Sequence, residues 1–573
     1  MSTPKTDPAQ LLASLFQTGQ DMMRQFDATG GSADRKLDPA AHFISASEQF
    51  AAMQQDLIKQ MTGYWSGMMG IAAPGQEPGT SGTKDNDRRF AGEAWSNDPR
   101  YDLMKRTYLA YSNFWQQAVE STAVDEQTKA KLRYDMRQFV DAMSPSNFLA
   151  TNPEAMQLAL ETGGQSLAQG MQLFLEDLGK GRISTTDESA FTVGKNLAVS
   201  PGAVVFQNEL IQLIQYSPLT QRVHKRPLVI IPPCINKFYI LDLQPENSLV
   251  RYAVEQGHTV FLASWRNVDA EMGHLTWDDY LETGVMKAID VALAISKADK
   301  ANTLGFCVGG TLLSCALAVM KARDEDTVAS MTLLTTMLDF TDTGEIGALV
   351  SEQSVASRDA KIGGGGLMHG KELSFTFSSL RANDLMWQYV VNGYLKGKAP
   401  PAFDMLYWNA DNTNLPGPMF CWYVRNTYLE NNLREPNKTI QCGVPVDLSQ
   451  IDVPAFLYAS REDHIVPWRT AYASSELLAG EVTFVLGASG HIAGVINPAS
   501  KNKRKHWVGG TAGPDPERWL ETARDEPGSW WPQWSAWLEQ QAGPEIAARS
   551  ILGNRKYRSI EPAPGRYAMQ KAD

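Results

Sequence analysis

With 573 residues, the chain is longer than the ~250 residues that a single α/β domain reaches, so we expect one large domain with a further part added to it. Apolar residues make up 43% of the composition and charged residues 20%, which excludes wholesale disorder and allows a sizeable core. The net charge of -12 excludes a general attraction to nucleic acid, so an anionic ligand would need a local basic patch.

The cysteines are too few and too scattered for a disulfide framework or a zinc site, since none forms a C-x-x-C pair. They are Cys234, Cys307, Cys315, Cys421 and Cys442. The start of the chain lacks a basic segment followed by a long apolar run, and no stretch reaches the ~18 apolar residues of a membrane span. We therefore expect a cytoplasmic protein with no metal site, no secretory signal and no transmembrane segment.

The first part of the chain, residues 1–187, is expected to form a mainly α-helical N-terminal domain. Apolar residues recur at helical spacing over residues 10–70. Residues 73–88 are rich in Pro, Gly, Ser, Thr and charge, which predicts a linker or loop. Helical patterning returns over residues 89–180.

The remaining part, residues 188–573, alternates short apolar runs with helical segments. Strands are predicted in RPLVIIPP (226–233), HTVFLASW (258–265), TLGF (303–306), VASMTLLTTMLDF (328–340), VPAFLYAS (453–460) and VTFVLG (482–487). Helices are predicted in DDYLETGVMKAIDVALAISKA (278–298) and TLLSCALAVMKA (311–322). This alternation predicts parallel βαβ units and a sheet covered by helices.

The alternation stops over residues 341–450, which contain a glycine run and many aromatic residues. We expect this stretch to be a cap insertion over the active edge of the sheet. The alternative is that its aromatic residues simply extend the core. After the last predicted strands, WWPQWSAWL (530–538) is expected to be a packing helix.

The segment Thr303–Gly310 contains Gly305-x-Cys307-x-Gly309, the spacing of a nucleophile elbow with sulfur in place of a hydroxyl. Such a turn exposes the nucleophile at a helix N-terminus, where the helix dipole favours a thiolate. The N–H of Val308 then points to where an oxyanion would form. The alternative is an inert buried cysteine, because free cysteines are commonly core residues.

Two partners follow Cys307 in the chain, each just after a predicted strand. Asp463 follows VPAFLYAS, and His491 follows VTFVLG. Taken singly, each suits an ordinary loop, but nucleophile, acid and histidine in this order are typical of the α/β-hydrolase fold. His464 is a possible supporting residue beside the acid. The second oxyanion donor is expected to be backbone N–H near Ile235, after the early strand.

A cysteine nucleophile favours acyl transfer between thioesters, because the acyl-cysteine intermediate has an energy similar to that of a CoA thioester. An ordinary hydrolase more often uses serine. The residues alone therefore favour a cysteine-dependent acyltransferase, and they leave open a thiol-dependent hydrolase or thioesterase of the same fold.

Longer segments around these residues resemble those of class I polyhydroxyalkanoate synthases. They are GFCVGGT, SREDHIVPW, GASGHIAGVINP, MSPSNFLATNPEA, IEPAPGRY and PPCINKFYILDLQPENSLVRYAVEQGHTVFLASWRN. The resemblance covers roughly residues 88–570. It implies polymerisation of (R)-3-hydroxyacyl-CoA, chiefly 3-hydroxybutyryl-CoA, into a polyester with release of CoA.

The resemblance also implies roles and partners. Cys307 is the acylated nucleophile, His491 activates it, and Asp463 helps to activate the 3-hydroxyl of the growing chain. No cofactor is implied, because the CoA thioester is the substrate. The implied partners are a second copy in a homodimer, the surface of intracellular polymer granules and the proteins on it.

Besides the polymerase and the thiol-dependent hydrolase, a third alternative is a granule-binding protein without activity. The intact triad argues against it, because such a protein does not need all three residues.

Overall fold

The computed structural model describes residues 87–572, so the expected helices of residues 10–70, and the expected linker apart from Asp87 and Arg88, lie outside the described residues. From Ala94 to Lys180 the chain is helical. The helices are α3 (Ala94–Asn97), α4 (Pro99–Ser121), α5 (Glu126–Ala142), α6 (Pro153–Glu161) and α7 (Gln165–Lys180). Asp98, Asp125 and Asn152 cap α4, α5 and α6 by accepting backbone N–H groups that a helix cannot satisfy internally.

Within residues 87–572, eleven strands form one sheet in the order β15-β14-β13-β12-β7-β6-β4-β5-β2-β1-β17. The central strands, from β13 to β5, are parallel, as the alternation predicts. Its strands are β1 (Gly202–Gln207), β2 (Ile211–Tyr216), β4 (Leu228–Ile231), β5 (Val260–Trp265), β6 (Ala301–Phe306), β7 (Val328–Leu334), β12 (Ala455–Ser460), β13 (Val482–Gly487), β14 (Lys505–Val508), β15 (Arg524–Pro527) and β17 (Glu561–Pro562).

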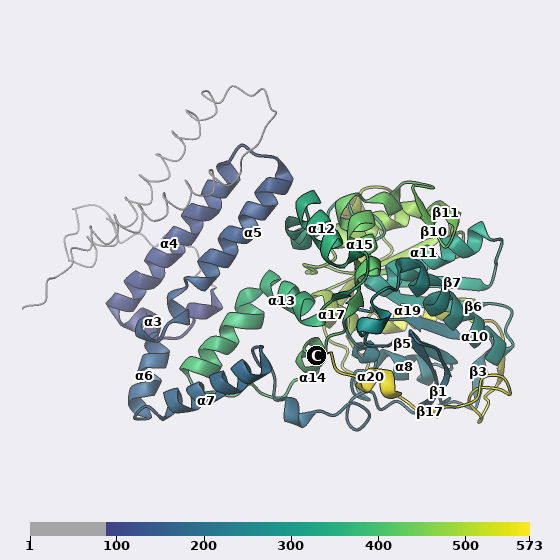
Figure 1. Cartoon of the computed structure of the whole chain (residues 1–573), viewed down its shortest axis with the longest axis horizontal. Helices are drawn as coiled ribbons and strands as arrows, with labels where there is room; N and C mark the ends of the chain where they lie inside the picture. Colours follow the sequence, from purple (N-terminus) through teal and green to yellow (C-terminus); the bar gives the residue numbers. More distant parts are fainter. Residues whose placement is uncertain (1–86, 573) are drawn as a thin grey trace, which may run out of the picture.

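Helices cover both faces of this sheet (Figure 1). One core lies between the sheet and α10 and α11, and the other lies between the sheet and α8 and α19. After residue 188 and outside the cap insertion, the α-helices are α8 (Leu249–Glu255), α9 (Trp277–Asp279), α10 (Lys287–Ser296), α11 (Val308–Ala322), α16 (Trp468–Ala473), α17 (His491–Val495), α18 (Pro516–Thr522), α19 (Trp531–Gln541) and α20 (Arg566–Met569). The tryptophan-rich segment is the buried packing helix α19, as expected.

Residues 341–450 leave the sheet after β7 and return to it at β12. They form α12 (Glu352–Arg358), α13 (Gly370–Leu380), α14 (Asp404–Asn409), α15 (Gly417–Val424), the π-helical η12 (Arg425–Leu429), the 3-10 helix η8 (Gly344–Leu349) and two short strand pairs, β8 (Leu367–Met368) with β9 (Leu415–Pro416) and β10 (Thr439–Gln441) with β11 (Val444–Val446). Aromatic residues of the cap insertion pack onto the sheet domain: Trp422 stacks on Trp277, with ring centroids 4.6 Å apart. The same residues thus cover the sheet and extend its core.

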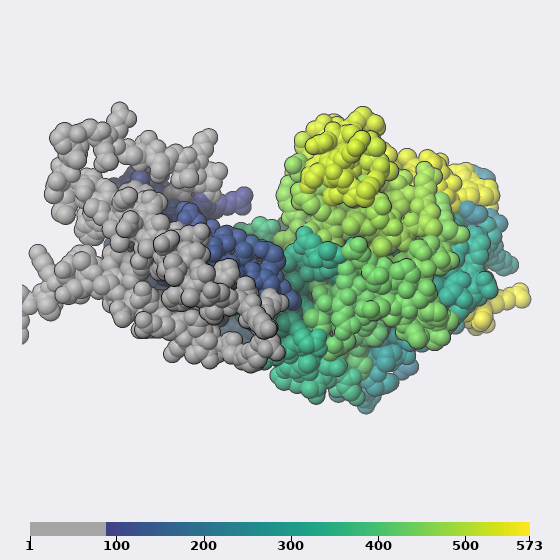
Figure 2. All heavy atoms as spheres, turned by 90° about the horizontal axis from the view of Figure 1, so that it is seen from above, coloured from purple at the N-terminus to yellow at the C-terminus, as the bar shows by residue number. Residues whose placement is uncertain are grey.

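The cap insertion also contacts the helical region. The hydroxyl groups of Tyr134 and Ser379 are 2.6 Å apart, and Tyr394 donates to Asp177 at 2.7 Å. In the space-filling view, blue residues of the helical region lie next to teal and green residues of the second part (Figure 2). The division at residues 187 and 188 stays a prediction.

One expected strand end was wrong, and several strands of the sheet were not predicted. The strand predicted to run to residue 340 ends at Leu334, because Thr335 has φ 40°, which turns the chain out of the sheet. β1 and β2 were missed: they form an antiparallel hairpin beside β5. None of the helices in the described part of the chain combines the length and apolarity needed to cross a bilayer.

Candidate active site

The turn between β6 and α11 places Cys307 in a conformation that side chains rarely adopt, with φ 54° and ψ -128°. Close contacts require the glycines around it. A Cβ atom on Gly305 would lie 2.4 Å from the Cα of Gly310, and one on Gly309 would lie 2.3 Å from the carbonyl oxygen of Ile231. Backbone strain of this kind is retained where the surrounding structure holds it, often at functional sites. The turn is therefore a nucleophile elbow in its geometry as well as in its spacing.

Asp463 and His491 meet at the carboxyl ends of the neighbouring strands β12 and β13. The Nδ1 of His491 lies 2.7 Å from Oδ2 of Asp463. The other oxygen of Asp463, Oδ1, accepts the backbone N–H groups of Ile465 at 2.8 Å and Val466 at 2.9 Å. These bonds fix the carboxylate, which in turn orients the imidazole.

His491 also interacts with the candidate nucleophile. Burial disfavours the charged form of His491, but Asp463 and the sulfur of Cys307, through charge and hydrogen bonding, outweigh burial and raise the pKa of His491 to about 10. The imidazole ring stacks on Phe306, with centroids 5.7 Å apart. Since Nδ1 faces the acid, Nε2 is the nitrogen left for Cys307. This arrangement can move a proton to and from sulfur.

Of the two expected oxyanion donors, Val308 directly follows Cys307, and Ile235 lies in a loop that packs against the elbow. Val308 is the first residue of α11, where a backbone N–H has no acceptor within the helix. Ile235 lies in the loop after β4, which we call the oxyanion loop (residues 232–237). This loop is held close to the elbow, because Gly309 packs against the carbonyl oxygens of Ile231 and Pro232. The Trp265 indole donates to Pro232 O at 2.9 Å.

Comparisons with known proteins show the family of this chain. A family model described as Poly-beta-hydroxybutyrate polymerase (PhaC) N-terminus matches residues 86–253, and one described as alpha/beta hydrolase fold matches residues 227–498. Poly(3-hydroxyalkanoate) polymerase subunit PhaC of Cupriavidus necator is 52% identical over 99% of this chain and 98% of its own length. The chain belongs to the poly(3-hydroxyalkanoate) polymerase family. It is therefore an acyltransferase, and the predicted α/β-hydrolase fold is confirmed.

A second polymerase and one solved structure are also similar to this chain. The poly(3-hydroxyalkanoate) polymerase of Methylorubrum extorquens is 42% identical over 92% of this chain and 86% of that protein. The crystal structure of a putative hydrolase from Agrobacterium vitis aligns with a TM-score of 0.32 at 14% identity, over 60% of this polymerase-family chain and 97% of the hydrolase.

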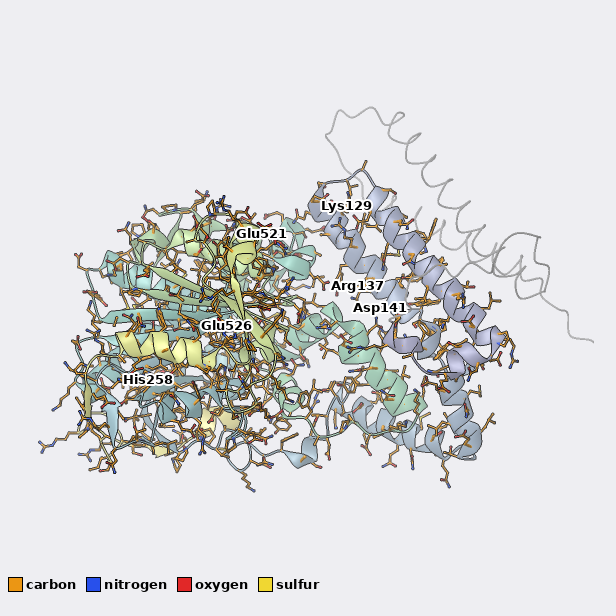
Figure 3. The ribbon with its side chains drawn as sticks, turned by 180° about the vertical axis from the view of Figure 1, so that it is seen from behind. Lys129, Arg137, Asp141, His258, Glu521 and Glu526 are labelled. Carbon is orange, nitrogen blue, oxygen red and sulfur yellow. The ribbon has the colours of Figure 1, made fainter. Side chains whose placement is uncertain are left out.

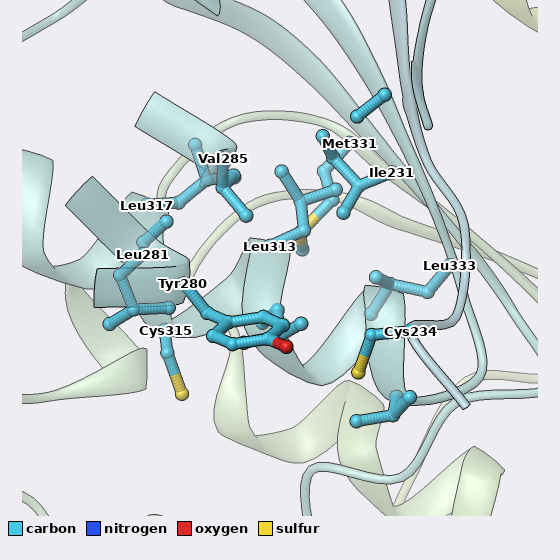
Figure 4. Close-up of a cluster of buried hydrophobic side chains, with 14 of the residues drawn as sticks. Ile231, Cys234, Tyr280, Leu281, Val285, Leu313, Cys315, Leu317, Met331 and Leu333 are labelled. Carbon is cyan, nitrogen blue, oxygen red and sulfur yellow. The ribbon is translucent and has the colours of Figure 1, made fainter. Parts of the chain in front are cut away.

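The other cysteines of this polymerase-family chain lie in settings that suppress ionisation. Cys234 and Cys315 are buried among apolar side chains of the core (Figure 4). Burial raises the pKa of Cys315 to about 12, and it raises that of Cys234 further. Burial likewise raises the pKa of Cys421 to about 11 and that of Cys442 to about 12. Cys315 is thus a core residue.

His464 lies at the junction between the helical region and the cap insertion. It lines a cavity of about 220 Å³ together with Arg137 and Asp141 of α5 and Glu345 of η8. Figure 3 shows Arg137 and Asp141 on α5, near the second part of the chain. Burial lowers the pKa of His464 although Asp463 opposes this, and its Nδ1 has no hydrogen-bond partner among residues 87–572. A supporting role for His464 stays a prediction.

The sequence did not single out Tyr428 of η12. Its side chain is half-buried, and burial and then the charge of the nearby Cys307 raise its pKa. Its ring packs at right angles to that of Tyr423, with centroids 5.7 Å apart. The aromatic run of the cap insertion was the available signal, but a run of aromatics does not say which of them faces the sulfur.

Proposed function

We propose that the chain polymerises (R)-3-hydroxyacyl-CoA, chiefly 3-hydroxybutyryl-CoA, into polyhydroxyalkanoate, with release of CoA and through an acyl-cysteine at Cys307. The observation that carries the proposal is the strained Cys307 at the N-terminus of α11, in interaction with a His491 that Asp463 orients. The names of the Cupriavidus and Methylorubrum relatives support the polymer product.

In the first half-reaction, His491 holds the proton of the Cys307 thiol, because its pKa is raised to about 10, and the sulfur attacks the thioester carbonyl of the substrate. Negative charge on the carbonyl oxygen is stabilised by the N–H groups of Val308 and Ile235. The bond from the carbonyl carbon to the CoA sulfur then breaks. CoA leaves as the thiol after taking the proton from the imidazolium, and the acyl group stays on Cys307.

In the second half-reaction, a 3-hydroxyl attacks the acyl-cysteine. A secondary hydroxyl has a pKa far above neutral, so it needs a base within hydrogen-bond reach. His491, held by Asp463, takes the proton while the new ester bond forms and the bond to the Cys307 sulfur breaks. The proton then returns to that sulfur. The chain therefore grows by one ester for each CoA released.

The proposal extends to assembly and location. We propose a homodimer that acts in the cytoplasm at the surface of polymer granules, with a mainly helical domain over residues 1–187 and a catalytic domain over residues 188–573. The assembly and the location are supported by the resemblance of residues 88–570 to class I polyhydroxyalkanoate synthases. Sedimentation of the purified chain tests the dimer, and imaging of a fluorescent fusion in polymer-producing cells tests the location.

The test of function uses the purified full chain with (R)-3-hydroxybutyryl-CoA. Free thiol and insoluble polyester are measured together. We expect CoA release in proportion to ester bonds in a precipitated polymer. CoA release with only soluble 3-hydroxybutyrate would contradict the proposal and identify a thioesterase, because water rather than a hydroxyl would then have attacked the acyl-cysteine.

A further inference from the structure

The oxyanion loop is bound from outside by a segment of the cap insertion. The backbone N–H of Thr413 donates to the carbonyl of Ile235 at 3.0 Å, and Asn236 and Asn412 form an antiparallel bridge. The indole of Trp408 donates to the carbonyl of Lys237 at 2.6 Å. Residues 408–413 of the cap insertion therefore hold the carbonyl groups of Ile235 and Lys237, which follow the Ile235 N–H in the chain.

A buried carboxylate holds that segment in place. The side chain of Asp411 is 1% exposed. Its Oδ2 accepts from the hydroxyl of Tyr239 at 2.7 Å and from the ammonium of Lys571 at 2.9 Å. Its Oδ1 is buried and has no partner in the described part of the chain. A carboxylate in such a place is stable only if it is paired, so Asp411 depends on both donors.

Lys571 reaches Asp411 from the C-terminal tail (residues 561–572). Its ammonium lies 5.0 Å from the ring centroid of Tyr407, and its carbonyl accepts from Asn267 at 3.3 Å. Figure 1 shows the C-terminal end of the chain beside α14 and α20. The side chain of Lys571 is 58% exposed, so it closes the buried cluster from the solvent side.

A second ammonium links the tail to the oxyanion loop itself. Lys237 is buried, and its Nζ donates to the carbonyl of Tyr567 at 3.3 Å. Burial lowers the pKa of Lys237 to about 8, an effect that Asp411 opposes and Lys571 strengthens. One carboxylate and two ammonium groups therefore join the oxyanion loop, the cap insertion and the C-terminal tail.

We propose that Asp411 and Lys571 are positioning residues for the second oxyanion donor: their ion pair holds the cap segment 408–413 against the oxyanion loop and so fixes the N–H of Ile235. The inference rests on the proposed acyl transfer at Cys307. Neither residue touches the reacting atoms. Loss of the pair lets the loop shift, and a misplacement of about 1 Å costs up to ~10²-fold in rate.

The test compares Lys571→Met, which removes the charge, with Lys571→Arg, which keeps it, in the full chain. Lys556→Met is the matched control, since it removes an exposed lysine of the same C-terminal part. CoA release in a single turnover at saturating (R)-3-hydroxybutyryl-CoA reports acylation. Alkylation of Cys307 by iodoacetamide, followed by mass spectrometry, reports the nucleophile, because that substitution forms no oxyanion.

We expect Lys571→Met to slow acylation about tenfold or more with KM and alkylation unchanged, and Lys571→Arg to restore most of the rate. Acylation at the wild-type rate would overturn the inference, as would an equal fall in alkylation, which indicates general damage. A change confined to KM would overturn it too, because Lys571 would then contact the substrate. A wild-type chain that releases no CoA contradicts the proposed function instead.

Discussion

Replacing Asp463 by asparagine changes the proton on His491 while leaving the shape of the site intact. Asp463 Oδ1 accepts two backbone N–H groups, at 2.8 and 2.9 Å. An amide nitrogen cannot accept them, so the amide of Asp463→Asn keeps its oxygen there and turns its NH2 group toward Nδ1 of His491. Nδ1 must then act as acceptor, which places the ring proton on Nε2, the nitrogen that serves Cys307.

The two half-reactions respond differently to this tautomer. A thiol is a far stronger acid than a secondary hydroxyl and depends less on a base, so acylation should fall only about tenfold. A secondary hydroxyl is hardly ionised at neutral pH, so loss of its general base lowers the rate of chain elongation ~10²–10⁴-fold. The Asp463→Asn chain should therefore acylate Cys307 and then stall. His491→Gln should fail in both steps.

Rapid-quench measurement of CoA release distinguishes these outcomes. We expect a burst of about one CoA per site, followed by a steady rate at least tenfold more impaired than the burst. Equal losses in the burst and in the steady rate would refute the reasoning, because Asp463 would then only orient His491 for the first step.

Three further predictions concern packing, pH and assembly. Gly309→Ala should lower the free energy of unfolding by about 1–3 kcal/mol and slow acylation, because the new Cβ would meet the carbonyl oxygens of Ile231 and Pro232. Thermal unfolding measures this loss, and Gly364→Ala is the control, since its new Cβ would meet nothing within 4 Å. His258 is buried beside His224, and burial and then that imidazole lower the pKa of His258 to about 3. His258 therefore stays neutral in the folded chain, whereas in the unfolded chain it binds a proton below about pH 6.5. The free energy of unfolding consequently falls as the pH is lowered from 6.5 to 3. His258→Phe should remove about 2 kcal/mol of the loss between pH 7 and 5 in urea titrations, and an unchanged slope would contradict this. The apolar residues at helical spacing before residue 88 suggest a docking element for partner chains or the granule surface. Removal of residues 1–88 should therefore weaken dimerisation and granule attachment more than it changes alkylation of the nucleophile, and a fully active, granule-bound dimer would contradict this docking role.

The site was largely predictable because its parts are local in sequence. The elbow needs glycines two residues either side of Cys307, and that spacing is visible in eight letters. Asp463 and His491 each follow an apolar run that ends in a loop, and parallel strands bring such loops to one edge of a sheet. The pairing of these two side chains at 2.7 Å follows from strand order rather than from any contact visible in the sequence.

The features that the sequence missed depend on contacts between distant segments. β1 and β2 lack a clear alternation, because β2 is buried along its whole length. The end of β7 is set by Thr335, whose N–H bonds to the carbonyl of Tyr458 in β12. The link between Asp411 and Lys571 joins residues 160 positions apart, and no local pattern marks either one.

The central claim is that Cys307 carries the acyl group, and mass spectrometry of the chain quenched within one turnover of (R)-3-hydroxybutyryl-CoA tests it most directly. We predict a 3-hydroxybutyryl adduct on the peptide that contains Cys307, absent in Cys307→Ala and retained in Cys315→Ala, whose sulfur is buried. An adduct on another cysteine, or CoA release by Cys307→Ala at the wild-type rate, would contradict the account.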